Sequence, residues 1–140
     1  MVEILIIDDE SQIRRLISRI LRGAGHSVRE AENGSEGLRL FEERRPALVV
    51  TDIVMPETEG IEMIRTMHRA APEMPILAVS GGSSPVYLRA ATELGAMAAL
   101  EKPFFPDQLL AAVTKLLAGP AAIKRTGRSL SNGGARRRRR

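Results

Sequence analysis

Five short apolar runs alternate with five amphipathic stretches over the first 119 residues, and this alternation limits the possible folds more than any other feature. The first run, Val2 to Ile7, is almost entirely Ile, Leu and Val, which is typical of a strand buried on both faces. The stretch from Ile13 to Ala24 then repeats apolar residues at helical spacing and ends among glycines. Repeated alternation of strand and helix predicts a parallel sheet with helices on both faces.

The other elements follow the same pattern. The predicted strands after the first are residues 26–31, 47–52, 75–80 and 96–102, and the predicted helices after the first are residues 33–46, 60–71, 83–95 and a stretch from 106. Ser84 is expected to cap the helix at 83–95, with Pro85 in its first turn and Gly95 at its end.

The charge of the chain is segregated. Residues 1–119 contain all 17 acidic residues but only 13 of the 21 basic ones and so carry a charge of −4, whereas the last 21 residues carry +8. We interpret residues 1–119 as one mildly acidic domain and residues 120–140 as a basic tail, which we expect to be disordered because it is rich in Gly, Ser and Arg. The chain has no cysteine, and its N-terminal apolar run is too short for a membrane span or a signal peptide. These features predict a cytoplasmic protein.

Charged or hydroxyl side chains lie at the carboxyl ends of four of the predicted strands. Asp8 and Asp9 follow the first strand, Asp52 ends the third, Ser80 ends the fourth and Lys102 ends the fifth. In an open α/β sheet, ligands bind beyond the carboxyl ends of the strands. We therefore expect one crevice to gather three carboxylates, a hydroxyl and an ammonium group.

The charges in that crevice do not balance. Three ionised carboxylates and one lysine leave two negative charges in excess, and like charges a few ångströms apart repel by several kcal/mol at a partly desolvated site. Neither His26 nor His68 lies at a strand end, so the site offers oxygen ligands only. Hard oxygen ligands suit Mg²⁺. The pattern predicts a magnesium site.

Taken in order, these motifs resemble the receiver domain of bacterial two-component response regulators. The resemblance covers residues 1–119 and rests on Asp8-Asp9, on "DIVMPETEG" with Asp52, Met55, Pro56 and Gly60, on Ser80, and on "KPF" at Lys102 to Phe104. It implies a flavodoxin-like, doubly wound sheet of five parallel strands in the order 2-1-3-4-5 with five helices.

The resemblance also implies roles for the site residues. Mg²⁺ would be held by Asp9, Asp52 and the backbone carbonyl of Val54, with Asp8 acting mainly through bound water. Asp52 would be the phospho-acceptor, attacking a phosphohistidine to form an acyl phosphate. No turnover of an external substrate is expected beyond the domain's own phosphorylation and dephosphorylation.

Two further residues would contact the phosphoryl group. Lys102 and the hydroxyl of Ser80 would each bind a phosphoryl oxygen, and the Lys102-Pro103 bond is expected to be cis, as in the family.

One position departs from the family pattern. Three residues before Lys102, where the family has an aromatic residue that turns inward after phosphorylation, this chain has Ala99. Ala99 cannot act in that way, so we expect the signal to travel through residues 81–90 and the helix that carries Tyr87.

The implied partners are a sensor histidine kinase or histidine phosphotransfer protein, and a downstream protein that binds the helix after Ser84, the strand at 96–102 and the last helix. Contact of Arg136–Arg140 with nucleic acid or an anionic surface is a weaker alternative, since no aromatic residue interrupts the arginines. We expect a stand-alone regulator. The alternatives are a scaffold that signals without phosphate and the receiver part of a longer DNA-binding regulator.

Overall fold

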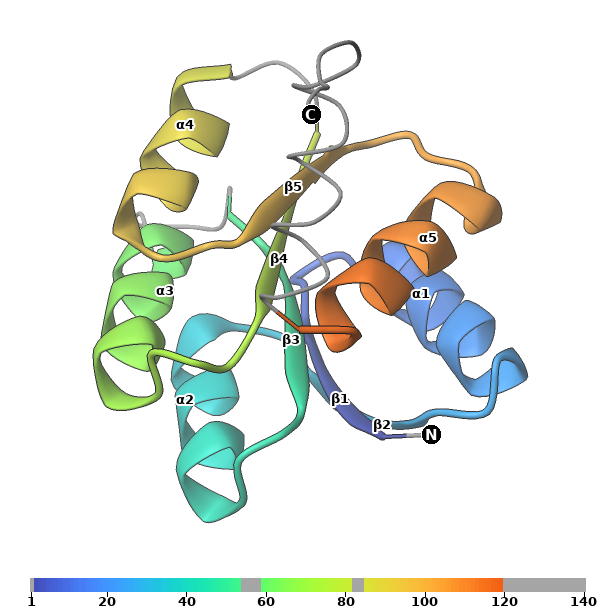
Figure 1. Cartoon of the computed structure of the whole chain (residues 1–140), viewed down its shortest axis with the longest axis horizontal. Coiled ribbons are helices and arrows are strands. Elements are labelled where there is room, and N and C mark those ends of the chain that lie inside the picture. Colours follow the sequence, from blue (N-terminus) through green and yellow to red (C-terminus); the bar gives the residue numbers. More distant parts are fainter. Residues whose placement is uncertain (1, 54–58, 82–84, 120–140) are drawn as a thin grey trace, which may run out of the picture.

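Strands and helices alternate strictly along the chain in the computed structural model, which describes residues 2–53, 59–81 and 85–119 (Figure 1). The strands are β1 (Glu3–Ile7), β2 (Ser27–Ala31), β3 (Leu48–Asp52), β4 (Ile76–Ser80) and β5 (Ala98–Glu101). The helices are α1 (Ser11–Gly23), α2 (Gly34–Glu43), α3 (Glu59–Ala70), α4 (Pro85–Leu94) and α5 (Pro106–Leu117). The predicted basic tail and the predicted Ser84 cap lie outside the described residues.

The strands form one parallel sheet in the order β2-β1-β3-β4-β5. The chain therefore leaves β1 in one direction to build β2 and returns across it to build β3, β4 and β5 on the other side. In register, Ile4 of β1 pairs with Val28 on one side and with Leu48 on the other. This confirms the predicted fold class, and it places a change of direction in the strand order between β1 and β3.

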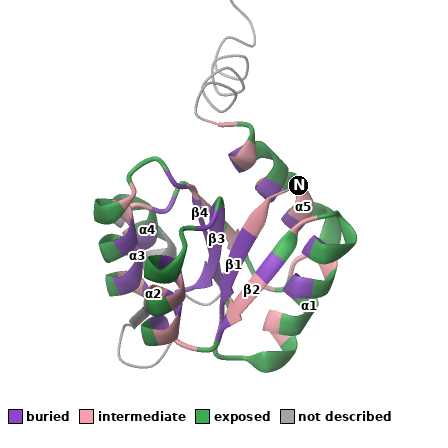
Figure 2. Ribbon diagram, turned by 90° about the horizontal axis from the view of Figure 1, so that it is seen from below, coloured by how far each residue is buried: buried purple, intermediate pink, exposed green. Residues whose placement is uncertain are grey.

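Side chains alternate across each strand, so the sheet contributes to two separate cores. Figure 1 shows α1 and α5 on one face of the sheet and α2, α3 and α4 on the other. Leu5 and Val49 face the second group, while Ile4 and Val50 face the first. Figure 2 shows the central strands β1, β3 and β4 as largely buried, whereas β2 is only partly buried. Because β1, β3 and β4 are covered on both faces, their apolar runs are continuous rather than alternating.

The helices begin and end where local chemistry favours it. Asn33 caps α2 by accepting a hydrogen bond from the Glu36 backbone nitrogen at 2.8 Å, and the Glu36 carboxylate accepts one from the Glu32 backbone nitrogen at 2.9 Å. Pro106 stands at the first position of α5, where a missing N–H group costs nothing.

Gly95 follows α4 with a φ of 142°, a conformation that other residues rarely adopt. A Cβ atom at Gly95 would lie 2.5 Å from the Cβ atom of His68 on α3. Glycine at this position therefore allows the end of α4 to pack directly against α3.

No helix in the described ranges has the length and apolar character that crossing a membrane requires.

Candidate functional site

Asp8 and Asp52 are buried side by side at the carboxyl edge of the sheet. Asp8 directly follows β1, and its backbone nitrogen extends the pairing with β2 by donating to the Ala31 carbonyl oxygen at 3.1 Å. Asp52 is the last residue of β3 and pairs with Val79 of β4. The exposed fractions are 0% for Asp8 and 4% for Asp52, which is unusual for carboxylates and calls for a charged partner.

Lys102 supplies that partner. Its ammonium nitrogen lies 3.0 Å from Asp8 Oδ2 and 3.5 Å from Asp52 Oδ2, and its side chain is only 10% exposed. The backbone nitrogen of Lys102 donates to the Ser80 carbonyl oxygen at 2.6 Å, which fixes the residue to the end of β4. The Lys102-Pro103 peptide bond is cis, as predicted.

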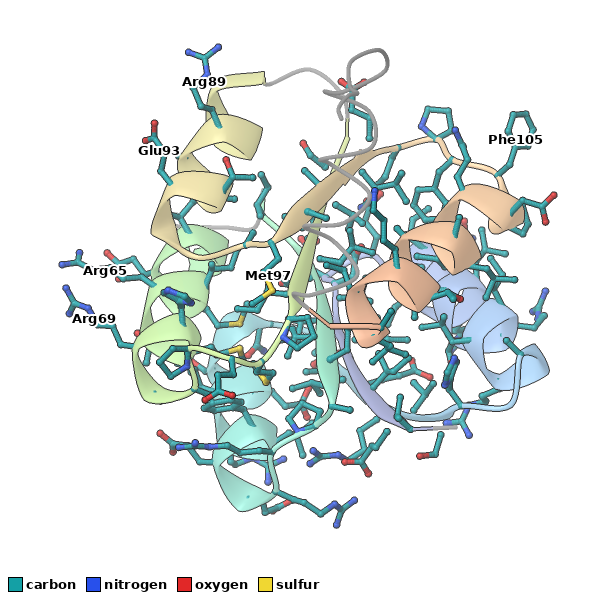
Figure 3. All side chains as sticks on the ribbon, in the orientation of Figure 1. Arg65, Arg69, Arg89, Glu93, Met97 and Phe105 are labelled. Atoms are coloured by element: carbon teal, nitrogen blue, oxygen red, sulfur yellow. The ribbon has the colours of Figure 1, made fainter. Side chains whose placement is uncertain are left out.

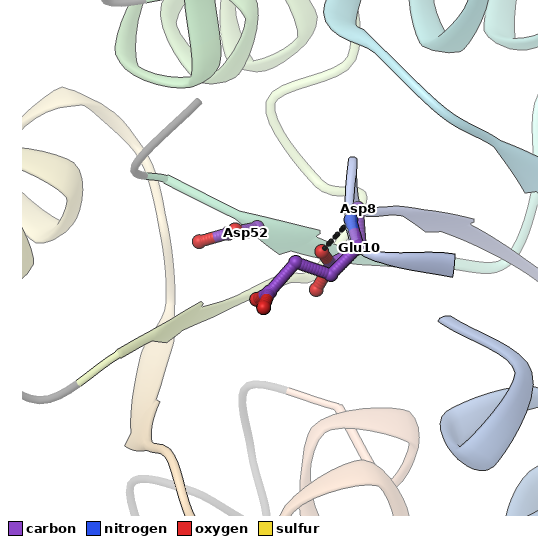
Figure 4. Close-up of side chains that lie close together, drawn as sticks. All are labelled: Asp8, Glu10 and Asp52. Carbon is purple, nitrogen blue, oxygen red and sulfur yellow. Dashed lines mark hydrogen bonds between the residues drawn. The ribbon is translucent and has the colours of Figure 1, made fainter. Parts of the chain in front are cut away.

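A fourth charged residue, Glu10, completes the group. Its Oε1 atom lies 3.3 Å from the Lys102 ammonium nitrogen, and carboxylate oxygens of Asp8, Glu10 and Asp52 all lie within 4.8 Å of one another. Figure 4 shows the three side chains gathered at this edge, with the hydrogen bond of 2.9 Å from the Glu10 backbone nitrogen to the Asp8 carboxylate.

Asp9, the residue predicted to bind the metal directly, is exposed and lies outside this group. The cause is a local turn, because the backbone bends at Asp9 and the Asp8 carboxylate accepts a hydrogen bond from the Glu10 backbone nitrogen two residues on, at 2.9 Å. This turn holds Glu10, with φ −90° and ψ 108°, beside Asp8. The sequence signal that could have identified Glu10 was the position of Asp8 directly after a strand, where aspartate commonly forms such a turn with the residue two positions on. The role of Asp9 stays a prediction.

Arg14 is a second residue that the sequence did not identify. Its Nη1 atom donates to the Asp8 carbonyl oxygen at 2.7 Å, and its Nε atom donates to Glu30 at 3.1 Å. Because Arg14 lies on α1 and Glu30 lies on β2, these bonds hold the turn after β1 between its neighbours.

Burial and neighbouring charges shift the pKa values of Asp8 and Lys102. Burial raises the pKa of Asp8, and the hydrogen bonds from the Glu10 backbone and from Lys102 only partly oppose this effect. For Lys102, burial lowers the pKa, but its hydrogen bond to Asp8 and the negative charge of Asp52 outweigh burial, so the net pKa is raised. Lys102 is therefore a permanent positive charge at neutral pH.

Ser80 brings an unused hydroxyl group to the same edge. The residue is 1% exposed, and among the described residues its Oγ atom has no hydrogen-bond partner. Leaving a buried hydroxyl unpaired costs roughly 1–3 kcal/mol, so this donor is available to an oxygen-rich ligand.

The donor set fits a hard divalent cation. Asp8, Glu10 and Asp52 offer carboxylate oxygens close enough to share one ion, and two negative charges remain in excess after Lys102 is counted. Val54, whose carbonyl was predicted to be a further ligand, lies outside the described residues.

Neither Ala99 nor the stretch 81–90, through which the signal was predicted to pass, is among the charged residues that the structure gathers at the site. Ala99 lies on β5 opposite Ala78 and is exposed. Within the stretch 81–90, residues 82–84 and the side chain of Tyr87 lie outside the described residues.

Known proteins resemble this chain in both sequence and fold. A family described as "Response regulator receiver domain" matches residues 4–114. The response regulator MprA of Mycobacterium sp. (strain KMS) is 36% identical over 116 residues, which cover 83% of this chain and 50% of that protein. MprA of Mycobacterium tuberculosis (strain CDC 1551 / Oshkosh) is 34% identical over the same share of each chain. The chain thus spans about half the length of these relatives.

Solved structures agree with this comparison. A CheY-like receiver domain protein from Methanospirillum hungatei JF-1 has a TM-score of 0.79 and 31% identity, covering 88% of this chain and 97% of that one. NtrX from Brucella abortus, in complex with ADP, has a TM-score of 0.81 and 28% identity, covering 97% of this chain and 30% of that one. Together with the strand order and the acidic strand ends, these matches establish that the chain belongs to the response regulator receiver domain family.

Proposed function

We propose that this receiver domain accepts a phosphoryl group on Asp52 from a histidine kinase or a histidine phosphotransfer protein. The observation that carries the proposal is the Lys102 ammonium group, which is held 3.5 Å from the carboxylate of a nearly buried aspartate. A structural ion pair would need no further carboxylates, whereas this site gathers three around one lysine and leaves an excess of negative charge.

The proposed step is a displacement at phosphorus. An oxygen of Asp52 forms a bond to the phosphorus atom of the phosphohistidine, and the bond from phosphorus to the imidazole nitrogen breaks. The electron pair of that bond stays on the imidazole nitrogen, which leaves on the partner protein. The product on this chain is an acyl phosphate.

The surrounding residues would stabilise the charge that the phosphoryl oxygens carry. Lys102 would supply a fixed positive charge, since its raised pKa keeps it protonated at neutral pH. The Ser80 hydroxyl would donate a hydrogen bond to another phosphoryl oxygen, and so would gain the partner that it lacks among the described residues.

Asp9, Asp52 and the Val54 carbonyl would hold Mg²⁺, with Asp8 acting mainly through bound water. The bound ion would neutralise phosphoryl oxygens and offset the excess negative charge of the site.

We also propose that the signal passes to a protein partner through α4, β5 and α5. In Figure 1, β5 lies between α4 and α5 at the edge of the sheet. A mostly apolar pocket next to this edge is lined by Met97, Ala98, Ala111, Ala112, Lys115 and Leu116. Met97, labelled in Figure 3 just before β5, is 37% exposed and offers an apolar contact. A cytoplasmic location is part of the same proposal.

The test is phosphorylation of the full chain with acetyl phosphate and Mg²⁺, followed by intact-mass measurement. We expect wild type to gain the mass of one phosphoryl group, and Asp52→Asn to gain none because an amide is not a nucleophile toward phosphorus. Asp107→Asn, an exposed acid at the start of α5, is the matched control and should behave as wild type. An unmodified wild type, or an Asp52→Asn variant that is still modified, would reject the proposal.

The absence of an aromatic residue at Ala99 supports one other candidate, a receiver-like scaffold that binds partners without phosphate. This candidate predicts no mass gain in the same experiment. Whether the domain acts alone or within a longer regulator is a separate proposal, since the curated relatives are about twice as long as the matched region.

A further inference from the structure

Glu10 differs from the other charged groups of the site in its exposure. Its side chain is 62% exposed, against 0% for Asp8, 5% for Asp52 and 10% for Lys102. It nevertheless reaches the Lys102 ammonium nitrogen at 3.3 Å. Glu10 therefore stands between solvent and the buried part of the site, in contact with the lysine that would bind the incoming phosphoryl group.

The contacts of Lys102 leave little capacity for another ligand. An ammonium group has three N–H donors. Three carboxylates lie near it, at 3.0 Å for Asp8, 3.3 Å for Glu10 and 3.5 Å for Asp52. Asp8 and Glu10 accept hydrogen bonds from the ammonium group, and Asp52 forms an ion pair with it, so a phosphoryl oxygen that approaches Lys102 competes with these carboxylates.

Exposure decides which partner can be given up. Asp8 is fully buried and also accepts the hydrogen bond from the Glu10 backbone nitrogen, so its carboxylate cannot turn toward water. Asp52 is the group that receives the phosphoryl. Glu10 can rotate into solvent and recover its hydration, since an exposed ion pair contributes little net stability.

We propose that Glu10 is a positioning residue that holds Lys102 before phosphorylation and competes with the phosphoryl donor for it. This inference rests on the proposed function and extends it. It adds that Glu10 must release Lys102 when the phosphoryl donor approaches Asp52. The contact with Glu10 therefore slows phosphorylation of the wild-type protein. A variant in which residue 10 cannot hold Lys102 should react faster with a small phosphodonor.

The experiment measures the second-order rate constant for phosphorylation by acetyl phosphate at saturating Mg²⁺, using the full chain. We expect Glu10→Gln to raise this constant about 3- to 10-fold, because a neutral amide holds the ammonium more weakly than a carboxylate. Glu42→Gln removes the same charge from an exposed position on α2 and should leave the rate unchanged.

Glu10→Asp separates contact from charge. It keeps the negative charge but shortens the side chain by one methylene group, so the carboxylate no longer reaches Lys102. If competition for Lys102 is the cause, Glu10→Asp should also be faster than wild type. A Glu10→Asp rate equal to wild type, together with a faster Glu10→Gln, would mean that the charge acts at a distance and would overturn the inference.

Ionic strength gives a readout that a merely structural role would not change. An exposed ion pair is screened by salt, so the ratio of the Glu10→Gln rate to the wild-type rate should fall toward one as salt rises. A Glu10→Gln rate equal to or below wild type at low salt would also overturn the inference. Failure of the proposed function would look different, because wild type and all variants would then remain unphosphorylated.

Discussion

Replacing Gly60 with alanine is expected to slow phosphorylation of Asp52 by roughly ten- to a hundredfold, although Gly60 itself carries no reactive group. A Cβ atom at this position would lie 2.7 Å from the Ile53 carbonyl oxygen and 2.9 Å from that of Asp52. These are backbone atoms and cannot rotate away, so either the start of α3 or the end of β3 must move. Movement of β3 displaces Asp52 from Lys102, which is 3.5 Å away.

The same substitution is expected to lower the free energy of unfolding by about 1–3 kcal/mol, the usual cost of overpacking a buried position. The rate would be measured with acetyl phosphate, and the stability by urea unfolding. Gly23→Ala is the matched control, because Gly23 lies at the end of α1 and a Cβ atom added there would meet nothing within 4 Å. It should leave the rate unchanged. A Gly60→Ala variant with wild-type rate and stability would show that the close approach of α3 to β3 is not needed.

Replacing Asp8 with asparagine is expected to make the metal-free protein more stable while reducing phosphorylation about a hundredfold. The ionised Asp8 carboxylate is fully buried within 4.8 Å of two other carboxylate groups. An asparagine side chain has almost the same shape and removes one of the repelling charges, and Lys102 keeps Glu10 and Asp52 as partners. The expected gain in the free energy of unfolding at pH 7, in buffer with EDTA, is on the order of 1–2 kcal/mol.

The pH dependence of this gain follows from the raised pKa of Asp8. The folded protein binds the Asp8 proton more tightly than the unfolded chain, whose aspartate pKa is about 3.9. This contribution to stability is complete below the unfolded-state pKa and is lost as the pH rises through the folded-state pKa. The stability advantage of Asp8→Asn should therefore be small at acidic pH and grow toward neutral pH.

Magnesium gives the complementary measurement. Mg²⁺ that binds the folded state raises its stability by mass action, so added Mg²⁺ should stabilise wild type more than Asp8→Asn and reduce the difference between them. Glu42→Gln, which removes an exposed acid, should show neither effect. An Asp8→Asn variant that is less stable than wild type without metal would mean that the bond from Asp8 to Lys102 outweighs the burial and repulsion of the carboxylate.

The fold and most of the site could be read from local patterns. Continuous apolar runs such as Val2 to Ile7 and helical spacing such as Ile13 to Ala24 determine the type of each element, and strict alternation leaves a parallel sheet as the solution. Because the carboxyl ends of parallel strands meet at one edge, residues that directly follow strands come together whatever the details of packing. Asp8, Asp52, Ser80 and Lys102 were found by that rule. The strand order and the cis bond before Pro103 followed from the family resemblance.

The orientation of individual side chains could not be read in this way. Asp8 and Lys102 are 94 residues apart in sequence. The ion pair between them depends on the side-by-side pairing of β1, β3, β4 and β5 in the correct register. The turn after β1 brings Glu10 toward Lys102 and leaves Asp9 exposed, because the backbone bends at Asp9 and the Asp8 carbonyl oxygen is held by Arg14 of α1. Local sequence determines which residues reach the carboxyl edge of the sheet. Contacts between distant segments determine which of those residues lie next to the Lys102 ammonium group.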